Sequence, residues 1–414
     1  MARLPDPTTL PGGAMLLPVY VPTALLAFGQ GVLVPTLPVY ALSLHASFGL
    51  VSLIVAALGF GTLSADVPAG FLLGRLGRRP VMLLGAALVA AATLGIGLVP
   101  HIPALVGLQF VVGVGTAMWG LSRHAYVTDV TVPAQRGRAI SVFGGINRAG
   151  NLAAPALGGV LAQAFGLAAP FFLAAALATL TAFVAFLFVP ETVQQGAGAP
   201  GHRVRWGLVA KMVRANWRDV SAAGVAQVFG QMIRAGRKLL IPLFGKAALG
   251  LDVAAIGTII SIGAAFDVAM FVPAGLTMDR FGRKVATVPS FAILAVGMAL
   301  LSFAADYRGL LVAAVVMGFG NGLGSGTMMT LGADLAPPGA VGEFLGFWRL
   351  IGDTGQSGGP LIVGQVADAF GLPATALVLC GIGLTAALAF AFLVRETRTG
   401  PGGGVGRRQT ADGR

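Results

Sequence analysis

Residues 70–79 read GFLLGRLGRR, and residues 275–284, which lie 205 positions further along the chain, read GLTMDRFGRK. Each stretch follows an apolar run and ends in basic side chains. Glycine permits close helix approach and a tight turn, and basic side chains in short loops beside apolar runs are typical of the cytoplasmic face of a membrane protein. Because the pattern occurs twice, the sequence predicts two copies of one membrane-embedded unit.

The same offset pairs identical residues along most of the chain. Asp, Pro and Glu are scarce in this Gly-rich and Ala-rich sequence, so their pairing is a stronger signal than the pairing of glycines. One ungapped offset across six apolar runs implies a duplication, and an even number of crossings per copy leaves the two copies parallel. The paired positions are 67–70 with 272–275, Gly113 and Gly115 with Gly318 and Gly320, Asp129 with Asp334, Gly150 with Gly355, Pro155 with Pro360, 165–167 with 370–372, and 191–192 with 396–397.

The composition is that of a membrane protein. Of the 414 residues, 56% are hydrophobic and 10% are charged, whereas a soluble domain has roughly 25% charged residues. A bilayer core needs about 20 apolar residues per helical crossing. We therefore expect an all-α membrane protein with twelve transmembrane helices in two parallel six-helix repeats. The apolar runs are 16–42, 50–73, 81–99, 103–127, 139–164, 169–189, 219–245, 254–278, 285–304, 309–331, 343–369 and 374–394.

These runs divide the chain into an N-terminal six-helix bundle at 1–189, a central cytoplasmic loop at 190–218, a C-terminal six-helix bundle at 219–397 and a cytoplasmic tail at 398–414. Within the central loop, 194–201 is expected to be a flexible linker because it offers no apolar face. The N-terminus lacks the pattern of a cleaved signal peptide, so the first helix is expected to be retained.

Basic side chains predict the orientation. When the loops are assigned alternately to the two sides, 19 of the 27 basic residues fall on one side and only Lys246 and Arg308 on the other. The positive-inside rule then places both termini in the cytoplasm. The 23 Arg against 4 Lys and the 62 Gly suggest a bacterial genome, so a bacterial inner membrane is expected. The rule also accounts for the net charge of +12, so no nucleic-acid partner is expected. Cys380 is the single cysteine, and no metal site or cofactor is expected.

The two loop stretches resemble the signature G-x-L-x-D-R-x-G-R-[RK] of the major facilitator superfamily. The second stretch has its acid at Asp279, where the first has Gly74, and the second half has Val341 opposite Arg136. Each half is therefore expected to hold only part of the cytoplasmic charge network. The residues that the resemblance assigns to a cytoplasmic gate are Gly70, Arg75, Gly77, Arg78, Arg136, Gly275, Asp279, Arg280, Gly282 and Arg283.

Further stretches resemble the drug:proton antiporter branch of that superfamily. Residues 29–38 are similar to its first-helix signature, and residues 150–159, GNLAAPALGG, to its fifth-helix signature G-x-x-x-G-P-x-x-G-G, with Ala154 in place of a glycine. The fourth-helix arginine that the family associates with proton coupling is absent from 109–115. The resemblance implies secondary transport by alternating access, with proton-linked efflux as the activity of the branch.

Charged side chains inside the apolar runs are candidate functional residues, because each costs about 3 kcal/mol unless it faces a cavity or a partner. Arg234, Arg237 and Lys238 share one helix face, which favours an anionic solute, although Lys238 equally fits a side chain that extends to the outer headgroups. A structural ion pair is the alternative for each acid. The candidates for the substrate and proton pathway are Asp66, Arg148, Asp267, Arg234, Arg237, Arg349, Asp353, Asn147 and Gln30.

The resemblance also implies that helix two packs near helix eleven and helix five near helix eight. The expected depths of Asp66 and Arg349 match, as do those of Asp267 and Arg148. We therefore predict two charge pairs that close the cytoplasmic side and separate when the protein opens inward. Protonation of the aspartate would favour that opening. The alternative is that both pairs are permanent and structural.

The favoured function is proton-linked efflux of amphipathic organic compounds by a monomer in the lipid bilayer. The excess of basic over acidic side chains in the runs supports an alternative, exchange or uptake of an organic anion or metabolite. A non-transporting membrane sensor is the alternative of another class. No enzyme activity is expected, because no catalytic or nucleotide-binding motif occurs and 190–218 is too short for a soluble domain.

Overall fold

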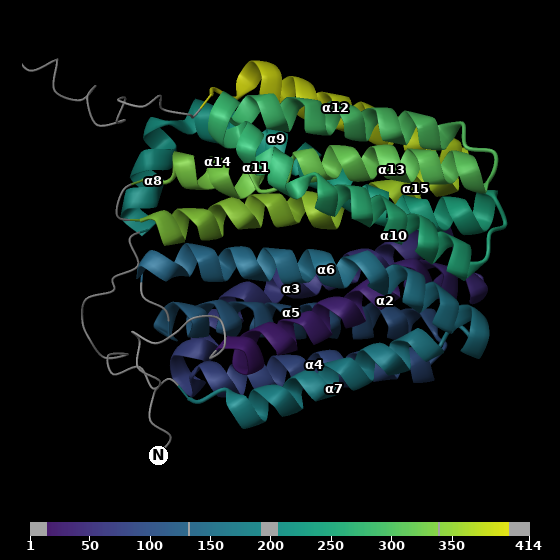
Figure 1. Ribbon diagram of the computed structural model, residues 1–414, viewed down its shortest axis with the longest axis horizontal. Helices are drawn as coiled ribbons and strands as arrows, with labels where there is room; N and C mark the ends of the chain where they lie inside the picture. The colour runs from purple at the N-terminus through teal and green to yellow at the C-terminus, as the bar shows by residue number, and fades with distance from the viewer. Residues whose placement is uncertain (1–14, 131–132, 192–205, 338–339, 397–414) are drawn as a thin grey trace, which may run out of the picture.

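The computed structural model describes residues 15–130, 133–191, 206–337 and 340–396, which fold into long helices that run side by side (Figure 1). No strand occurs in these ranges. Large apolar side chains such as Phe71, Phe165 and Phe392 are exposed on the surface. Helices satisfy their own backbone hydrogen bonds, so a bundle of this kind suits a lipid environment.

The first half consists of six long helices, each of which overlaps one predicted span. A π-helical turn, Leu16–Tyr20, leads into the first of them. The helices are α2 (Val21–Ser43), α3 (Phe48–Leu76), α4 (Arg78–Leu98), α5 (Ile102–Val130), α6 (Pro133–Phe165) and α7 (Ala169–Phe188).

The second half also makes six passes, but several of them are interrupted. Two passes are split into two helices each, and α15 bends at Gly371, whose φ of 83° divides it into two passes. π-Helical turns, Phe244–Ala248 and Ala389–Leu393, extend α9 and α15. The helices are α9 (Trp217–Leu243), α10 (Val253–Ala269) with α11 (Phe271–Phe281), α12 (Arg283–Ser302), α13 (Tyr307–Leu323) with α14 (Thr327–Leu335), and α15 (Val341–Leu388).

The twelve passes confirm the predicted fold class. By length and mean hydropathy, nine helical stretches of the described chain could cross a membrane, and one of them, Glu343–Leu393, is 51 residues long and makes two passes. The more highly charged α6 and α9 run alongside these stretches (Figure 1). One feature was not predicted: α8 (Trp206–Ala215) lies inside the stretch expected to be a loop. The expected linker at 194–201 lies outside the described residues.

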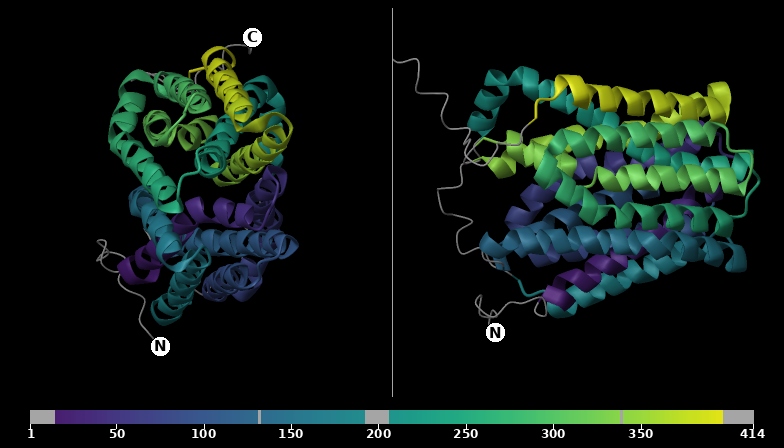
Figure 2. Two further views of the ribbon diagram at one scale, coloured as in Figure 1. Left: turned by 90° about the vertical axis from the view of Figure 1, so that its right-hand side faces the viewer. Right: turned by 45° about the horizontal axis from the view of Figure 1, so that its top comes forward.

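The two halves pack their helices in the same way. In the first half α3 and α4 both pack on α5, and in the second half α10 and α12 both pack on α13. Viewed along the helices, the halves form two bundles side by side (Figure 2). The halves meet along four helix pairs, α3 with α15, α6 with α10, α2 with α9, and α2 with α10. The first two pairs are those implied by the family resemblance.

The two ends of the bundle differ in charge. The turns at Gly77 and Gly282 and helix α8 lie at one end, here called the basic end, and the α2–α3 and α12–α13 connections lie at the opposite, far end. The far end carries Lys246 and Arg308. The basic side chains described at the basic end are Arg75, Arg78, Arg79, Lys211, Arg214, Arg218, Arg280, Arg283, Lys284 and Arg395.

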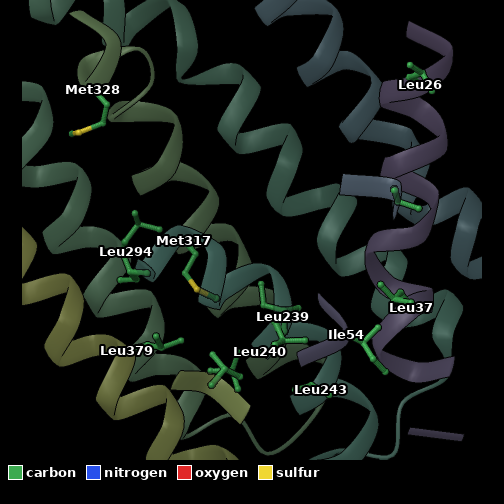
Figure 3. Close-up of a cluster of buried hydrophobic side chains, with 14 of the residues drawn as sticks. Leu26, Leu37, Ile54, Leu239, Leu240, Leu243, Leu294, Met317, Met328 and Leu379 are labelled. Atoms are coloured by element: carbon green, nitrogen blue, oxygen red, sulfur yellow. The ribbon is translucent and has the colours of Figure 1, made fainter. Parts of the chain in front are cut away.

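Glycines let helices within each half touch backbone to backbone. A Cβ atom at Gly113 would lie 2.1 Å from the carbonyl oxygen of Leu58, and one at the equivalent Gly318 would lie 2.0 Å from that of Gly263. Such close approach drives helix association in lipid. Buried apolar side chains from both halves, including Leu37 of α2 and others on α3 and α9, join in one cluster (Figure 3).

Candidate functional site

Two cavities lie between the halves, with volumes of about 540 Å³ and 390 Å³. Helices α2, α6, α9 and α13 supply the five residues that line both: Val34, Arg148, Arg237, Lys238 and Asn321. Both halves of the chain therefore contribute to one site near the middle of the bundle.

The centre of this site is an ion pair between the halves. Arg148 on α6 donates through Nη1 to Oδ1 of Asp267 on α10 at 2.8 Å. Asn321 donates to the other oxygen of Asp267 at 2.5 Å, and Arg148 also donates to the hydroxyl of Ser325. The Arg148 guanidinium lies 4.9 Å from the centre of the Phe271 ring. The Arg148–Asp267 contact predicted from depth is thus confirmed.

The partners of this pair lie at two interruptions of the helices. Asp267 comes just before the end of α10, and Ser325 lies between α13 and α14, next to Gly326 with a φ of 78°. Neither interruption was predicted from the sequence, and Asn321 and Ser325 were missed with them. The stretch 322–326, GLGSG, was the available signal, because glycine and serine are poor helix formers.

Arg234 and Arg237 line the larger cavity but are tied to backbone. Arg234 donates to the carbonyl oxygen of Gly324 at 3.0 Å and stacks 5.0 Å from the centre of the Phe291 ring. Arg237 donates to the carbonyl oxygen of Met317 at 3.0 Å. Lys238, for which two positions were considered, lines both cavities.

Amide side chains complete the lining of the larger cavity. Gln30 on α2 lines it and donates to Thr116 on α5 at 3.4 Å. The buried Gln109, at the start of the stretch that lacks the family's arginine, lines it as well. The side chain of Asn147, another predicted pathway residue, lies outside the described part of the structure.

The second predicted pair, Asp66 with Arg349, is not formed. Arg349 instead lies 3.5 Å from Asp353, one turn further along α15, and half of its side chain, 53%, is exposed. Asp66 is half-buried on α3, and among the described residues it makes no ion pair with Arg349. None of the three lines either cavity. The physical reason is the shape of the boundary between the halves.

That boundary is tight at the far end. Asp368 on α15 accepts backbone hydrogen bonds from Phe48 and Gly49 at the start of α3, at 2.9 Å and 2.8 Å. A Cβ atom at Gly257 on α10 would lie 2.2 Å from the carbonyl oxygen of Pro155 on α6. The halves are therefore in direct contact along both helix pairs there.

Toward the basic end the same helix pairs diverge. A Cβ atom added to Gly144 on α6, which lines the smaller cavity, or to Gly346 on α15 would meet no atom of the described residues within 4 Å. Gly275, expected to allow close helix approach, likewise faces open space, and Gly70 has only Leu121 within 3.9 Å. The cavities thus lie in a bundle that is closed at the far end and open at the basic end.

The two basic loops build the same network, although only part of it was expected in each. Arg78 pairs with Asp129 at 2.8 Å, and the equivalent Arg283 pairs with Asp334 at 3.1 Å. Glu191 accepts the backbone N–H of Arg78 at 3.0 Å. The first loop therefore keeps its ion pair although Gly74 replaces an acid, because Asp129 on α5 is the acidic partner of Arg78.

The second loop follows the same plan. Glu396 accepts the backbone N–H groups of Arg283 and Lys284 at 2.9 Å and 3.0 Å. Asp279 adds a contact of 3.9 Å to Arg283, but its side chain is 82% exposed. Gly77 and Gly282 have φ values of 90° and 105°, which side chains rarely tolerate. The loops are thus rigid corners that join α3 to α4 and α11 to α12.

Arg75 and Arg280 are two further predicted gate residues. Arg75 is exposed near the end of α3, and Arg280 stacks on its neighbour Phe281 at 5.3 Å. The side chain of Arg136 lies outside those the structure describes. The two ion pairs described for the loops, Arg78 with Asp129 and Arg283 with Asp334, each join residues of one half.

Comparison with known proteins agrees with this architecture. A model of the Major Facilitator Superfamily matches residues 20–234 and residues 231–412. An uncharacterized MFS-type transporter of Methanocaldococcus jannaschii is 20% identical over 354 residues, which is 86% of this chain and 91% of the relative. The tetracycline resistance protein, class C, of Escherichia coli is 29% identical over 299 residues, 67% of this chain and 71% of that protein.

Solved structures share the fold. The bacterial homologue of the human lysosomal transporter Spinster, in an inward-facing and occupied conformation, has a TM-score of 0.77 at 15% identity, over 94% of this chain and 98% of that chain. The two family matches together cover almost all of the sequence. The chain therefore belongs to the Major Facilitator Superfamily and is a multi-pass membrane transporter, not an enzyme.

Proposed function

We propose that this transporter moves an amphipathic organic anion by alternating access. The observation that carries the proposal is the charge of the central site. Four cationic side chains, Arg148, Arg234, Arg237 and Lys238, line the cavities, and Asp267 is the one carboxylate among the lining residues in the described chain. A net positive cleft with low-dielectric walls attracts an anion strongly.

The rest of the lining suits a solute with an apolar body. Leu26, Leu33 and Leu37 of α2 border the larger cavity, together with amide groups such as Gln30 and Gln356. A cavity of about 540 Å³ fits the range in which proteins bind small organic molecules. The leucine side chains would contact the apolar part of the solute, and the cations would bind its acidic group.

The boundary between the halves supports alternating access. Contact at the far end and separation at the basic end describe one of the two states that such a cycle requires. By the positive-inside rule the basic end would face the cytoplasm of a bacterial inner membrane, so this state would be inward-open. The 1–189 and 219–397 bundles would then rock about the central site, linked through 190–218.

Proton coupling would use Asp267. Protonation of its carboxylate would remove the negative charge that holds Arg148, and Arg148 would become available to an anionic solute. This route needs no arginine on the fourth helix. Asp66 and Asp353 are further carboxylates from which a proton could reach the open basic end.

A second candidate function is proton-linked efflux of amphipathic compounds whatever their charge. Two observations favour it: the resemblance of the first and fifth helices to the antiporter branch, and the relative named for tetracycline resistance. In this case the cations would be structural, as the backbone contacts of Arg234 and Arg237 allow.

Transport in proteoliposomes distinguishes the two candidates. We would compare dansylglycine, its neutral amide and the amine dansylcadaverine, which carry one fluorescent group with three different charges, with and without a pH gradient. The first proposal expects transport of the acid in clear preference to the other two. Equal transport of all three, driven by the pH gradient, would favour the second candidate, and transport of the amine alone would overturn the first.

A further inference from the structure

We propose that Lys238, and not Arg234 or Arg237 on the same helix α9, is the side chain that binds the acidic group of the solute. The inference rests on the proposed transport of an organic anion and assigns the residue that recognises it. It comes from comparing what each of the four cavity cations already contacts.

Three of the four cationic side chains already contact other groups of the protein. Arg148 is bound to Asp267 and Ser325, and it stacks on Phe271. Arg234 donates to the Gly324 carbonyl and stacks on Phe291, and Arg237 donates to the Met317 carbonyl. These contacts fix the helix interruption at 324–326 and the adjoining part of α13. Each backbone contact uses one of the five N–H groups of its guanidinium and holds that side chain against the chain.

Lys238 differs from all three. Its ammonium group makes no hydrogen bond, ion pair or ring contact within the described residues, and its side chain is exposed. It nevertheless lies inside the bundle, because it lines both cavities. Asp267, the one carboxylate among the described lining residues, already uses both oxygens with Arg148 and Asn321.

An unpartnered ammonium at this depth is costly unless water or an anion neutralises it. The cost of an ionised lysine in a membrane span is about 3 kcal/mol on insertion scales. The helical path of α9 continues for ten residues beyond Lys238 to Ala248, about 15 Å at 1.5 Å per residue, which separates its ammonium from the far headgroups. The predicted alternative, a side chain that extends to those headgroups, therefore does not account for it.

The chemistry of lysine suits the assigned role. Its ammonium is a compact charge with three donors on a flexible stem, so it can follow a carboxylate or sulfonate as the cavity changes shape. Arg237 on the preceding position adds positive charge, and Gln231 and Gln356 line the same cavity as further donors. The expected ligand is an amphipathic monoanion whose apolar part lies against α2.

The test is solute binding to the purified full-length protein in lipid nanodiscs, with dansylglycine as the acidic probe and dansylglycinamide as its neutral match. Lys238→Gln should weaken dansylglycine binding about tenfold or more, the loss expected for one charge-assisted contact, and leave dansylglycinamide unchanged. Lys238→Arg should retain most of the affinity. Lys246→Gln, at the far end and outside both cavities, is the matched control.

A second measurement does not depend on the fold of a variant. The sequence has only Lys211, Lys238, Lys246 and Lys284, so acylation of each amine can be followed by mass spectrometry. Dansylglycine should protect Lys238 and not Lys246. Unchanged affinity in Lys238→Gln, or equal loss for both probes, would overturn the assignment. If the wild-type protein binds neither probe preferentially, the proposed anion transport fails instead.

Discussion

Of the two charge pairs predicted across the boundary between the halves, one is formed in the structure and the other is not. Nη1 of Arg148 and Oδ1 of Asp267 lie 2.8 Å apart, whereas Arg349 is paired with Asp353 on its own helix and forms no described ion pair with Asp66. Both pairs were predicted from the helix neighbours that the family resemblance implies and from matching depth. The pair that formed has two further polar partners, Asn321 and Ser325.

The internal repeat explains much of the difference. Arg148 on α6 is equivalent to Asp353 on α15 under the 205-residue offset, and Asp267 on α10 is equivalent to Thr62 on α3. The position that holds a cation at one boundary therefore holds an acid at the other, where α3 offers no charged partner at the matching site. Arg349, one turn away, takes up that acid.

The comparison also corrects the gating hypothesis. Both pairs were expected to separate when the basic end opens, yet Arg148 and Asp267 remain in contact in a bundle that is open there. The α6–α10 pair is therefore linked at its centre, although both helix pairs diverge toward the basic end. We expect the Arg148–Asp267 contact to stabilise this state, and the Asp66 side of the boundary to change more during the cycle.

The largest effect should come from breaking the formed pair. Asp267→Asn or Arg148→Gln leaves one charge without its partner, with side chains 16% and 27% exposed. Loss of such a partner costs about 2–4 kcal/mol, somewhat less than for a fully buried pair. Thermal unfolding in nanodiscs should show a clear decrease, and the swap of Asp267→Arg with Arg148→Asp should recover part of it. Wild-type stability in both single variants would contradict the structural importance of the pair.

A slightly smaller loss of stability is expected from disturbing the close contact between α6 and α10 at Gly257. Gly257→Val places side-chain atoms against the Pro155 carbonyl, where even a Cβ atom would be 2.2 Å away. Overpacking of this kind costs about 1–3 kcal/mol. Gly381→Val is the matched control, because a Cβ atom there meets nothing within 4 Å among the described residues. Equal unfolding temperatures for the two variants would argue against close α6–α10 packing.

The loop networks should respond less strongly, and unequally. The Arg78 side chain is 8% exposed and its equivalent, Arg283, is 20% exposed. Arg78→Gln should therefore destabilise the protein by about 1–2 kcal/mol and Arg283→Gln by less, since exposed ion pairs contribute little. The exposed Arg75→Gln is the control. A larger loss for Arg283→Gln would show that Asp279 matters more than its exposure suggests.

The sequence predicted the passes and their pairing well, because both depend on properties that a single chain displays. Apolar runs set the crossings, and the offset revealed that Gly113 and Gly318 occupy equivalent close contacts. Matching depth was sufficient for Arg148 and Asp267. It was insufficient for Asp66 and Arg349, because depth says nothing about which conformation the halves adopt or about a competing acid one turn away.

Other contacts of the site could not be predicted, because they involve backbone groups that only the folded structure brings together. The contacts of Arg234 and Arg237 are to backbone carbonyl groups, which carry no sequence signal, so the sequence could not predict them. The Asp368 contact with Phe48 and Gly49 joins residues about 320 positions apart through backbone N–H groups. Only the structure distinguishes these tied side chains from those that are available to a solute.

The smallest effect on stability should come from Asp66 and Arg349, the predicted pair that is not formed. Asp66→Asn and Arg349→Gln remove side chains that make no contact with each other, and Arg349 is half exposed, so each should change stability by less than about 1 kcal/mol. Their role belongs to the state in which the basic end closes.

Because Cys380 is the single cysteine, a Cys380→Ala background allows Asp66→Cys with Arg349→Cys to be joined by a short thiol cross-linker. We expect little cross-linking in the open state and a marked rise when a transported anion or a pH gradient drives the cycle. Asp66→Cys with Lys246→Cys, whose second position lies at the far end, is the control that should stay unlinked. Efficient cross-linking of 66 and 349 that is independent of solute and pH would mean that α3 and α15 do not separate during transport, and the proposed asymmetry between the two boundaries would have to be abandoned.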